Sequence, residues 1–464
     1  MRKRLLMILA PVLFLAAIFG IAGVKRMADN QESIASIPET LPVQSRIDSG
    51  ETAHDLPLVS IETYDRPIDK ESDTWVRISV IDHPGGGNFL SDTPEQSAAA
   101  LINHRGASSY NIFDKKQYHI EFHPEEGDLG NLDLAVMGMG EGSDWVLNGP
   151  FLDRTLLRNH LIYSISRQIL DWAPETRLCE VYLDGEYQGV YVMIESIKND
   201  PARLDLTDYG LLSGRTAYIL KRDRDNTEEC LIQSYGLING YTSYQMSIIY
   251  PKAENLTEDQ QKYICDDISR FEEALYSDYF DDPNLGYAAY IDVDNFVDYY
   301  IINEFTMNSD ASYLSTYIYK DAAGKIRMTV WDYNNAFNNY MWDDKPTDEF
   351  LVAESNWYNR LFQDKAFTDK VIARYIELRQ GVLSEDALLA QIDEYILTLG
   401  DAIDRNFEVW GYTFYEGMLS DDEQGNSRDP GSYDEAIAQL KECIRLRGEF
   451  LDSNIQFLYQ FAIN

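Results

Sequence analysis

Two aspartates on either side of an expected β-hairpin are the feature of this sequence that most limits how the chain folds. The stretch Asn303–Phe337 reads NEFTMNSDASYLSTYIYKDAAGKIRMTVWDYNNAF and contains both Asp310 and Asp332. Between them, two short runs rich in β-branched and aromatic residues are separated by a turn at 321–324, which predicts a hairpin. A loop is therefore expected to carry the first aspartate and a strand end the second.

The residues before the hairpin predict a helix. Apolar side chains recur there at helical spacing, namely Val293, Phe296, Val297, Tyr300 and Ile301. The pattern ends near Asn308, so the order along the chain is helix, loop aspartate, hairpin, strand-end aspartate. Phosphoryl-transfer sites of the protein-kinase type have this order, with a first Asp that accepts or orients the hydroxyl proton and a second that holds Mg²⁺ against the phosphates. Asp at a loop start is equally a common turn or capping residue, so the spacing alone leaves both interpretations open.

The length and charge of the chain limit its class and its partners. A chain of 464 residues favours two lobes or domains over one small domain. The formal charge of −39 argues against nonspecific nucleic-acid binding, because a phosphate backbone requires a basic surface. We expect no nucleic-acid partner, and we expect ATP to bind only with a divalent metal and a few well-placed cations.

An apolar run near the N-terminus predicts a membrane anchor. Leu5–Val24 is an uncharged stretch that follows the basic residues Arg2–Arg4, and it is long enough to cross a bilayer as a helix. The basic residues favour a cytoplasmic N-terminus. We therefore expect a signal anchor over 1–27, a polar stalk over 28–56 and a membrane-anchored body outside the cytoplasm, with cleavage of the anchor left open.

The order of patterns along the body indicates an α+β fold. Strand patterns predominate over 57–225, which we expect to be a β-rich N-lobe. Helical patterns predominate over 226–464, which we expect to be a mostly helical C-lobe carrying both aspartates. The four cysteines are widely spaced and form no metal-binding pattern, and their pairing cannot be deduced from the sequence.

Several separate motifs resemble the spore-coat CotH kinase family. An N-x-D is followed by a Y-x-Y strand, G-K and W-D-Y-x-x-A-F within Asn308–Phe337. An R-G-x-S-S at Arg105–Ser109 precedes a K-K-x-Y at Lys115–Tyr118. L-R-N at Leu157–Asn159 and a predicted hairpin over Glu180–Tyr191 also match. The resemblance extends roughly from residue 98 to residue 451.

The resemblance implies a bilobal, atypical protein-kinase-like fold that binds ATP with Mg²⁺ and phosphorylates hydroxyl groups of a protein substrate. By position, Asp310 is the implied catalytic aspartate, and Asn308 is implied to brace the catalytic loop. Asp332 is the implied metal ligand, and Lys116 the implied nucleotide contact.

Two further residues are expected on the nucleotide side of the site. Arg105 belongs to the matched R-G-x-S-S motif, and we expect it to contact the nucleotide. Glu195 ends a strand with a buried pattern, and pairing with Lys116 is one interpretation of it. A surface glutamate is the alternative.

Two positions depart from the family pattern. The family usually has an Asn five residues after the catalytic Asp and a second Asp in W-D-x-D, whereas this chain has Ser315 and Asn334. We expect both near the metal, where Ser is a poorer neutral ligand and Asn removes one negative charge next to Asp332. The expected consequence is weakened metal binding, in a slow enzyme or in a pseudokinase that binds nucleotide. The alternative is that residue 334 only caps a turn.

Two other functions are compatible with the same scaffold. Adenylyl transfer or another ATP-dependent protein modification is one, because a fold does not fix the chemistry. A surface binding or adhesion module is the other; export favours it because ATP is scarce outside cells, and the retained metal ligands oppose it. The sequence does not identify the protein substrate.

Overall fold

The computed structural model describes residues 46–47, 50–207, 215–223, 230–242, 245–311 and 313–463. Residues 54–464 form one compact unit and residues 1–53 another. The predicted membrane helix over Leu5–Val24 lies outside the described residues, as does most of the predicted stalk. Within the described ranges, no helix is long and apolar enough to cross a bilayer.

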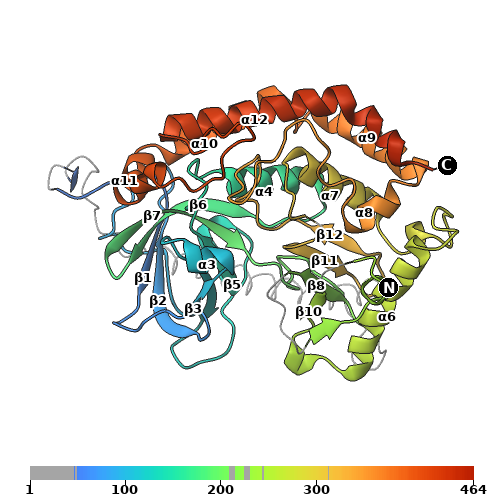
Figure 1. Cartoon of the computed structure of the whole chain (residues 1–464). Coiled ribbons are helices and arrows are strands. Elements are labelled where there is room, and N and C mark those ends of the chain that lie inside the picture. The colour runs from blue at the N-terminus through green and yellow to red at the C-terminus, as the bar shows by residue number, and fades with distance from the viewer. Residues whose placement is uncertain are drawn as a thin grey trace, which may run out of the picture. The chain divides into compact units, whose positions relative to one another are not determined.

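Seven strands from the first half of the body close into a barrel (Figure 1). They are β1 (Leu58–Glu62), β2 (Thr74–Ile81), β3 (Gln96–Arg105), β4 (Gln117–His123), β5 (Asp144–Asn148), β6 (Thr176–Leu183) and β7 (Glu186–Glu195). They are connected in the order β1-β2-β3-β4-β5-β7-β6, and a parallel pairing of β1 with β6 closes the barrel. Side chains alternate along each strand, so that one face fills the barrel with apolar residues such as Ile78, Ile120, Trp145 and Met193.

A second, antiparallel sheet contains the expected hairpin. Its strands are β8 (Tyr218–Arg222), β9 (Leu231–Ile232), β10 (Met246–Tyr250), β11 (Thr316–Lys320) and β12 (Arg327–Thr329), in the order β12-β11-β8-β10-β9. β11 and β12 pair antiparallel and are the predicted hairpin. β8 pairs with both β10 and β11, so this sheet takes strands from both sides of residue 225.

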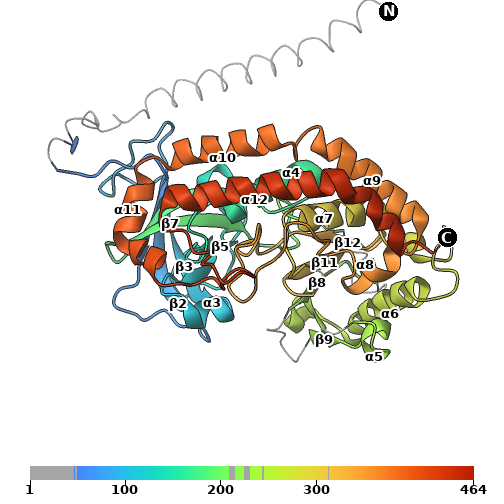
Figure 2. The same cartoon turned by 45° about the horizontal axis from the view of Figure 1, so that its top comes forward.

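Helices cover both sheets. They are α3 (Ser108–Ile112), α4 (Arg158–Ile169), α5 (Tyr235–Ile238), α6 (Glu258–Leu275), α7 (Val293–Phe305), α8 (Asn356–Leu361), α9 (Lys365–Arg379), α10 (Glu385–Leu399), α11 (Ala402–Trp410) and α12 (Tyr433–Asn454). Short 3₁₀ helices lie at Val136–Gly138, Ala253–Asn255, Tyr287–Ala289, Gly411–Tyr415 and Ile455–Phe461. α12 runs from the side of the barrel to the side of the second sheet (Figures 1 and 2). The mixture of sheets and helices confirms the predicted α+β class.

α7 is the predicted helix before the first aspartate, and it lies inside the core. It begins at Asp292, whose side chain accepts a hydrogen bond from the Asn295 N–H. The sequence pattern predicted one apolar face, but Tyr299, Ile302 and Asn303 are buried as well. After its exposed first turn, α7 is therefore enclosed by its neighbours, and it gives the following loop a rigid support.

A buried ion pair joins α7 to the C-terminal helix. Arg447 of α12 pairs with the Glu304 carboxylate and also donates to the Glu304 backbone carbonyl, at 2.9 Å. The same carboxylate accepts the backbone N–H groups of Leu351 and Val352 at 2.8 and 2.9 Å. A buried charge is stable only when it is paired and fully hydrogen-bonded, and here those bonds tie α12 and the segment near residue 350 to α7.

Candidate active site

The two aspartates lie at the ends of the elements that the sequence predicts. Asp310 is in the turn after α7, and its backbone carbonyl accepts the Leu314 N–H at 2.8 Å. Asp332 follows shortly after β12. Besides desolvation, the charge of Asp310 contributes to raising the pKa of Asp332, so the two carboxylates are electrostatically coupled.

The backbone at Asp332 is held in an unusual conformation by α4. Asp332 has a φ of 62°, a left-handed conformation that is uncommon for a residue with a side chain. Its N–H donates to the Tyr163 hydroxyl at 3.1 Å, and the next N–H, from Tyr333, donates to Asn159 Oδ1 at 2.7 Å. Both acceptors belong to α4, which thereby fixes the backbone that carries the Asp332 side chain.

The L-R-N motif contributes a second contact to the same segment. Arg158 donates from Nε to the Ala336 carbonyl at 2.9 Å and pairs with Asp153 at 2.5 Å. Together with Asn159, it holds the backbone of W-D-Y-x-x-A-F from one helix. This contact explains in physical terms why the two motifs belong together.

Asparagine side chains hold the loop of Asp310. Asn303 Oδ1 accepts hydrogen bonds from Asn308 Nδ2 at 3.0 Å and from the Tyr333 hydroxyl at 2.8 Å. Asn335 Nδ2 donates to Asp310 Oδ2 at 3.3 Å. Asn308 is buried, and its position suits the brace that the resemblance implies.

Two cations stand near Asp332. Arg105, at the end of β3, lies over the Trp331 ring with its guanidinium carbon 5.2 Å from the ring centre. Lys221, on β8, pairs with Asp223 at 3.0 Å. Both positive charges favour the ionised form of Asp332 and act to lower its pKa.

The net effect of this environment is a raised pKa at Asp332. As a whole residue Asp332 is exposed to solvent, while the protein groups around its carboxylate still displace part of its hydration. This desolvation, with the charges of Asp310 and Asp223, outweighs Arg105 and Lys221 and raises the pKa of Asp332 to about 6. A cation bound beside Asp332 would therefore stabilise the ionised form of its carboxylate.

A cavity of about 650 Å³, named here the site cavity, adjoins this group. It lies between the barrel and the second sheet, and its lining includes Arg105, Val146, Ile219, Tyr250, Tyr317 and Trp331. Its volume and its mixture of apolar and polar side chains suit a nucleotide-sized ligand. The site cavity reaches Trp331, the residue before Asp332, but neither it nor another cavity of about 690 Å³ beside α6 and the hairpin turn has Asp310 or Asp332 in its lining.

An ionised carboxylate lies in the wall of the site cavity. Asp144 is paired with Lys198 and lies 3.5 Å from His119 Nε2. Burial alone would raise the pKa of Asp144, but His119 and Lys198 hold it below its usual range. The barrel side of the site cavity therefore carries the ion pair between Lys198 and Asp144.

Both interpretations of Glu195, pairing with Lys116 and a place on the surface, are wrong, because Glu195 is buried and has another partner. The Lys116 ammonium donates to the carbonyls of Tyr110 and Phe113, at 2.7 Å each. Glu195 pairs with Arg203 at 2.6 Å instead. Lys116 precedes β4 and Glu195 ends β7, two strands that are not neighbours in the barrel, and neither residue lines the site cavity.

The sequence interpretation missed three of the charged residues described above. Lys221 lies on a strand that was predicted, but nothing in the sequence indicates that β8 lies beside the hairpin. Asp144 and Lys198 are far apart in the chain. They come together because β5, which begins at Asp144, pairs with β7, which ends shortly before Lys198. The charged run K-R-D-R-D at 221–225 was the one available signal for Lys221.

The two departures from the family pattern lie near the aspartates in sequence, and one is connected to Asp310. Asn334 Nδ2 donates to Asn335 Oδ1 at 2.9 Å, and Asn335 in turn contacts Asp310. Ser315 has a φ of 47° and precedes β11. The Glu304 carboxylate, at the end of α7, is bound by Arg447 and by two backbone N–H groups, so it is not available as a metal ligand.

The donor set suits a hard cation that arrives with phosphates. In the described part of the chain, no three or more His, Cys, Asp or Glu side chains are grouped so as to hold a metal ion. Mg²⁺ is usually bound through one or two carboxylates together with substrate phosphates. Asp332 and Asp310, with the amide oxygen of Asn334, supply donors of that kind.

A comparison with protein families agrees with the motifs. The family model described as CotH kinase protein matches residues 102–451, which is most of the chain. The matched range contains Arg105, Asp310 and Asp332. No curated protein matches the chain.

The pKa of Asp332 is directly testable. We expect its carboxyl to titrate near pH 6 in ¹³C spectra of the aspartate-labelled chain, assigned with Asp332→Asn. Lys221→Met should raise that pKa further, because a positive charge that favours the ionised form is lost. Lys325→Met, in the hairpin turn, is the matched control and should leave it unchanged. If Asp332 titrates near the ordinary aspartate pKa and Lys221→Met does not change that value, the described desolvation and charges around Asp332 are wrong.

Proposed function

Because the chain belongs to the CotH kinase protein family, we propose that it is a protein kinase that transfers the γ-phosphoryl group of ATP to a protein hydroxyl in the presence of Mg²⁺. The observation that supports the proposal most is the electrostatic coupling of Asp332 to Asp310, Arg105 and Lys221, next to a nucleotide-sized cavity that reaches the adjacent Trp331. The barrel and the second sheet with its helices would then be the two lobes of the kinase.

Asp310 is proposed to receive the proton of the acceptor hydroxyl. In the transfer, the acceptor oxygen forms a bond to the γ-phosphorus, the bond from that phosphorus to the β,γ-bridging oxygen breaks, and ADP leaves. Catalysis of this kind consists mainly of positioning and charge stabilisation. The hydrogen bond from Asn335 to Asp310, at 3.3 Å, favours one orientation of the carboxylate without neutralising it.

Asp332 is the proposed metal ligand, and Asn334 and Ser315 are proposed to assist it. A bound Mg²⁺ would supply charge neutralisation of the phosphates. The raised pKa of Asp332 supports this role, because a carboxylate that is costly to ionise alone is stabilised by a divalent cation.

Arg105 and Lys221 are the proposed phosphate contacts. A chain with a net charge of −39 repels ATP at long range, so local cations are needed where the phosphates bind. Arg105 lines the site cavity itself, and Val146 and Ile219 give the nucleotide base an apolar wall. In this proposal Lys221 takes the contact that the resemblance assigned to Lys116, whose ammonium is occupied by two carbonyls.

A second candidate is a nucleotide-binding pseudokinase. The observation that favours it is the neutral amide of Asn334, which is engaged with Asn335, where the family pattern has a carboxylate. Adenylyl transfer is the alternative chemistry at the same site. Mass spectrometry of the protein product separates addition of phosphate from addition of AMP, and nucleotide binding without any product identifies the pseudokinase.

Removal of the proposed metal ligand tests the enzyme function. Asp332→Ala should lower Mg²⁺-dependent phosphoryl transfer more than about a hundredfold, because metal coordination contributes several kcal/mol to such a transition state. Asp294→Ala is the matched control, since Asp294 lies on the exposed first turn of α7 with 80% of its side chain accessible. Circular dichroism should show both variants folded. Transfer by Asp332→Ala at the wild-type rate is incompatible with the proposed metal site.

The departures from the family pattern are tested by restoring the pattern. The double variant Asn334→Asp, Ser315→Asn should turn over faster or require less Mg²⁺, because a second carboxylate strengthens the binding of a hard cation. Initial rates are measured over a Mg²⁺ titration at fixed ATP. If neither the rate nor the Mg²⁺ requirement changes, residue 334 only caps the turn and the idea of an impaired metal site is wrong.

A further inference from the structure

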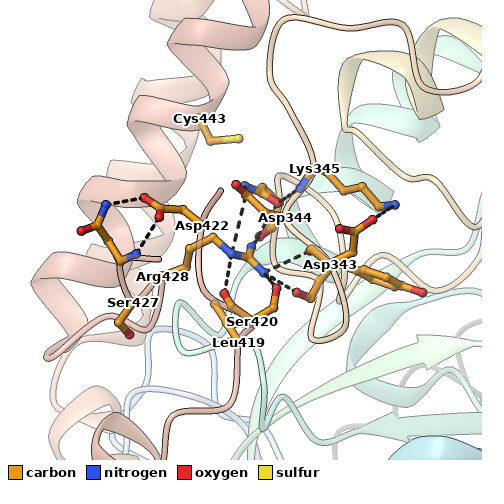
Figure 3. Close-up of polar contacts among 12 residues, drawn as sticks. Asp343, Asp344, Lys345, Leu419, Ser420, Asp422, Ser427, Arg428 and Cys443 are labelled. Atoms are coloured by element: carbon orange, nitrogen blue, oxygen red, sulfur yellow. Dashed lines mark hydrogen bonds and ion pairs between the residues drawn. The ribbon is translucent and has the colours of Figure 1, made fainter. Parts of the chain in front are cut away.

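One arginine near the C-terminus holds the segment that follows the proposed metal ligand. Residues 338–345, named here the platform segment, come directly after W-D-Y-x-x-A-F. Figure 3 shows Arg428 reaching into this segment from the loop that precedes α12. Its guanidinium donates to the backbone carbonyls of Asn338, Tyr340 and Asp343, at 2.7, 2.7 and 3.0 Å.

The loop that carries Arg428 is itself fixed. Arg428 donates to the Ser420 carbonyl at 2.8 Å and to its hydroxyl at 2.6 Å (Figure 3). The Ser420 N–H donates to the Met341 carbonyl at 3.1 Å. Next to Arg428, the Asp429 carboxylate accepts the N–H groups of Met418 and Leu419, at 3.0 Å each. The guanidinium is therefore presented from a rigid support.

A series of hydrogen bonds leads from the platform segment to the proposed catalytic aspartate. The side chain of Asn339, which is buried, donates to the Asn334 carbonyl at 2.7 Å. Asn334 donates to Asn335, and Asn335 donates to Asp310. Each bond fixes a group in or beside the site, so the backbone at 338–340 determines where Asn334 and Asp310 can lie.

The contacts of Arg428 differ from those of a phosphorylation switch. In switchable kinases a phosphorylated residue of the activation loop orders that loop by pairing with arginine. Here the arginine donates to three backbone carbonyls of the platform segment and to Ser420, and it lies 3.6 Å from the Asp344 carboxylate. Residues 338–345 contain no serine or threonine, and Tyr340 is their one hydroxyl-bearing residue.

We propose that Arg428 is a positioning residue that keeps the platform segment permanently in place, and thereby aligns Asn334 and Asp310 for transfer without phosphorylation of the segment. The proposal rests on the proposed kinase function for its catalytic part. Its structural part, the ordering of 338–345 by Arg428, stands independently of that function.

The test uses the full chain and its variant Arg428→Ala, with Arg445→Ala as matched control. Arg445 lies further along the chain, on α12, where it pairs with the exposed carboxylates of Glu442 and Glu449. Loss of several hydrogen bonds to a charged group should speed amide hydrogen exchange at 338–345 about tenfold or more. The control should leave exchange in the segment unchanged.

Kinetics separate a positioning role from general destabilisation. In Arg428→Ala we expect kcat to fall about tenfold or more, while the dissociation constant of Mg²⁺·ADP stays within about twofold. Arg428→Lys should recover little of either effect, because one ammonium cannot replace the planar fork of donors. Asn339→Leu, which keeps Arg428 but cuts the link to Asn334, should lower kcat without speeding exchange at the far end of the segment.

Each result tests one part of the proposal, either the ordering of the platform segment by Arg428 or the alignment of Asn334 and Asp310. Unchanged exchange at 338–345 in Arg428→Ala overturns the ordering role, whether or not the wild-type chain transfers phosphate. Faster exchange with unchanged kcat overturns the catalytic alignment. If Arg428→Ala does not fold, Arg428→Lys and Asn339→Leu decide between the same results. The wild-type protein is also treated with phosphatase. If phosphate is found on Tyr340 before the treatment and turnover is lost after it, the proposal that the platform segment is ordered without phosphorylation is wrong.

Discussion

The constraint on which the site depends is that two electrostatically coupled carboxylates must be held in place although their charges repel. Desolvation and the charge of Asp310 both raise the pKa of Asp332, so the fold works against this repulsion when no cation is bound. Two neutral groups are among those that hold these residues: Asn335 donates to the Asp310 carboxylate, and the Tyr163 hydroxyl accepts the Asp332 N–H. A neutral hydrogen-bonding partner orients a carboxylate or its backbone without cancelling the negative charge.

That arrangement demands rigid support, and it comes from three directions. α7 is enclosed by the core and is tied to α12 through Glu304 and Arg447. α4 fixes the strand end that carries Asp332. The loop before α12 fixes the segment after it through Arg428. Elements from the first, middle and last parts of the body therefore meet at one site, which is consistent with a family match that spans most of the chain.

The sequence predicted the local elements well and their assembly incompletely. α7 and the β11–β12 hairpin were evident from periodicity, because each is encoded by its own residues. Their carboxylates were found for the same reason. The expected pairing of Lys116 with Glu195 was wrong, because it depends on which barrel strands are neighbours. Glu195 pairs with Arg203 instead. Lys221 and Arg428 reach the site only through a strand order and a loop position that no local pattern encodes.

The most direct measurement is a crystal structure of the full chain with Mn²⁺ and a non-hydrolysable ATP analogue, with anomalous diffraction from the metal. The account predicts an anomalous peak at ligand distance from the Asp332 carboxylate, with the analogue in the site cavity and its phosphates directed toward Arg105 and Lys221. A nucleotide bound elsewhere, or a metal that contacts neither Asp332 nor Asp310, would contradict it.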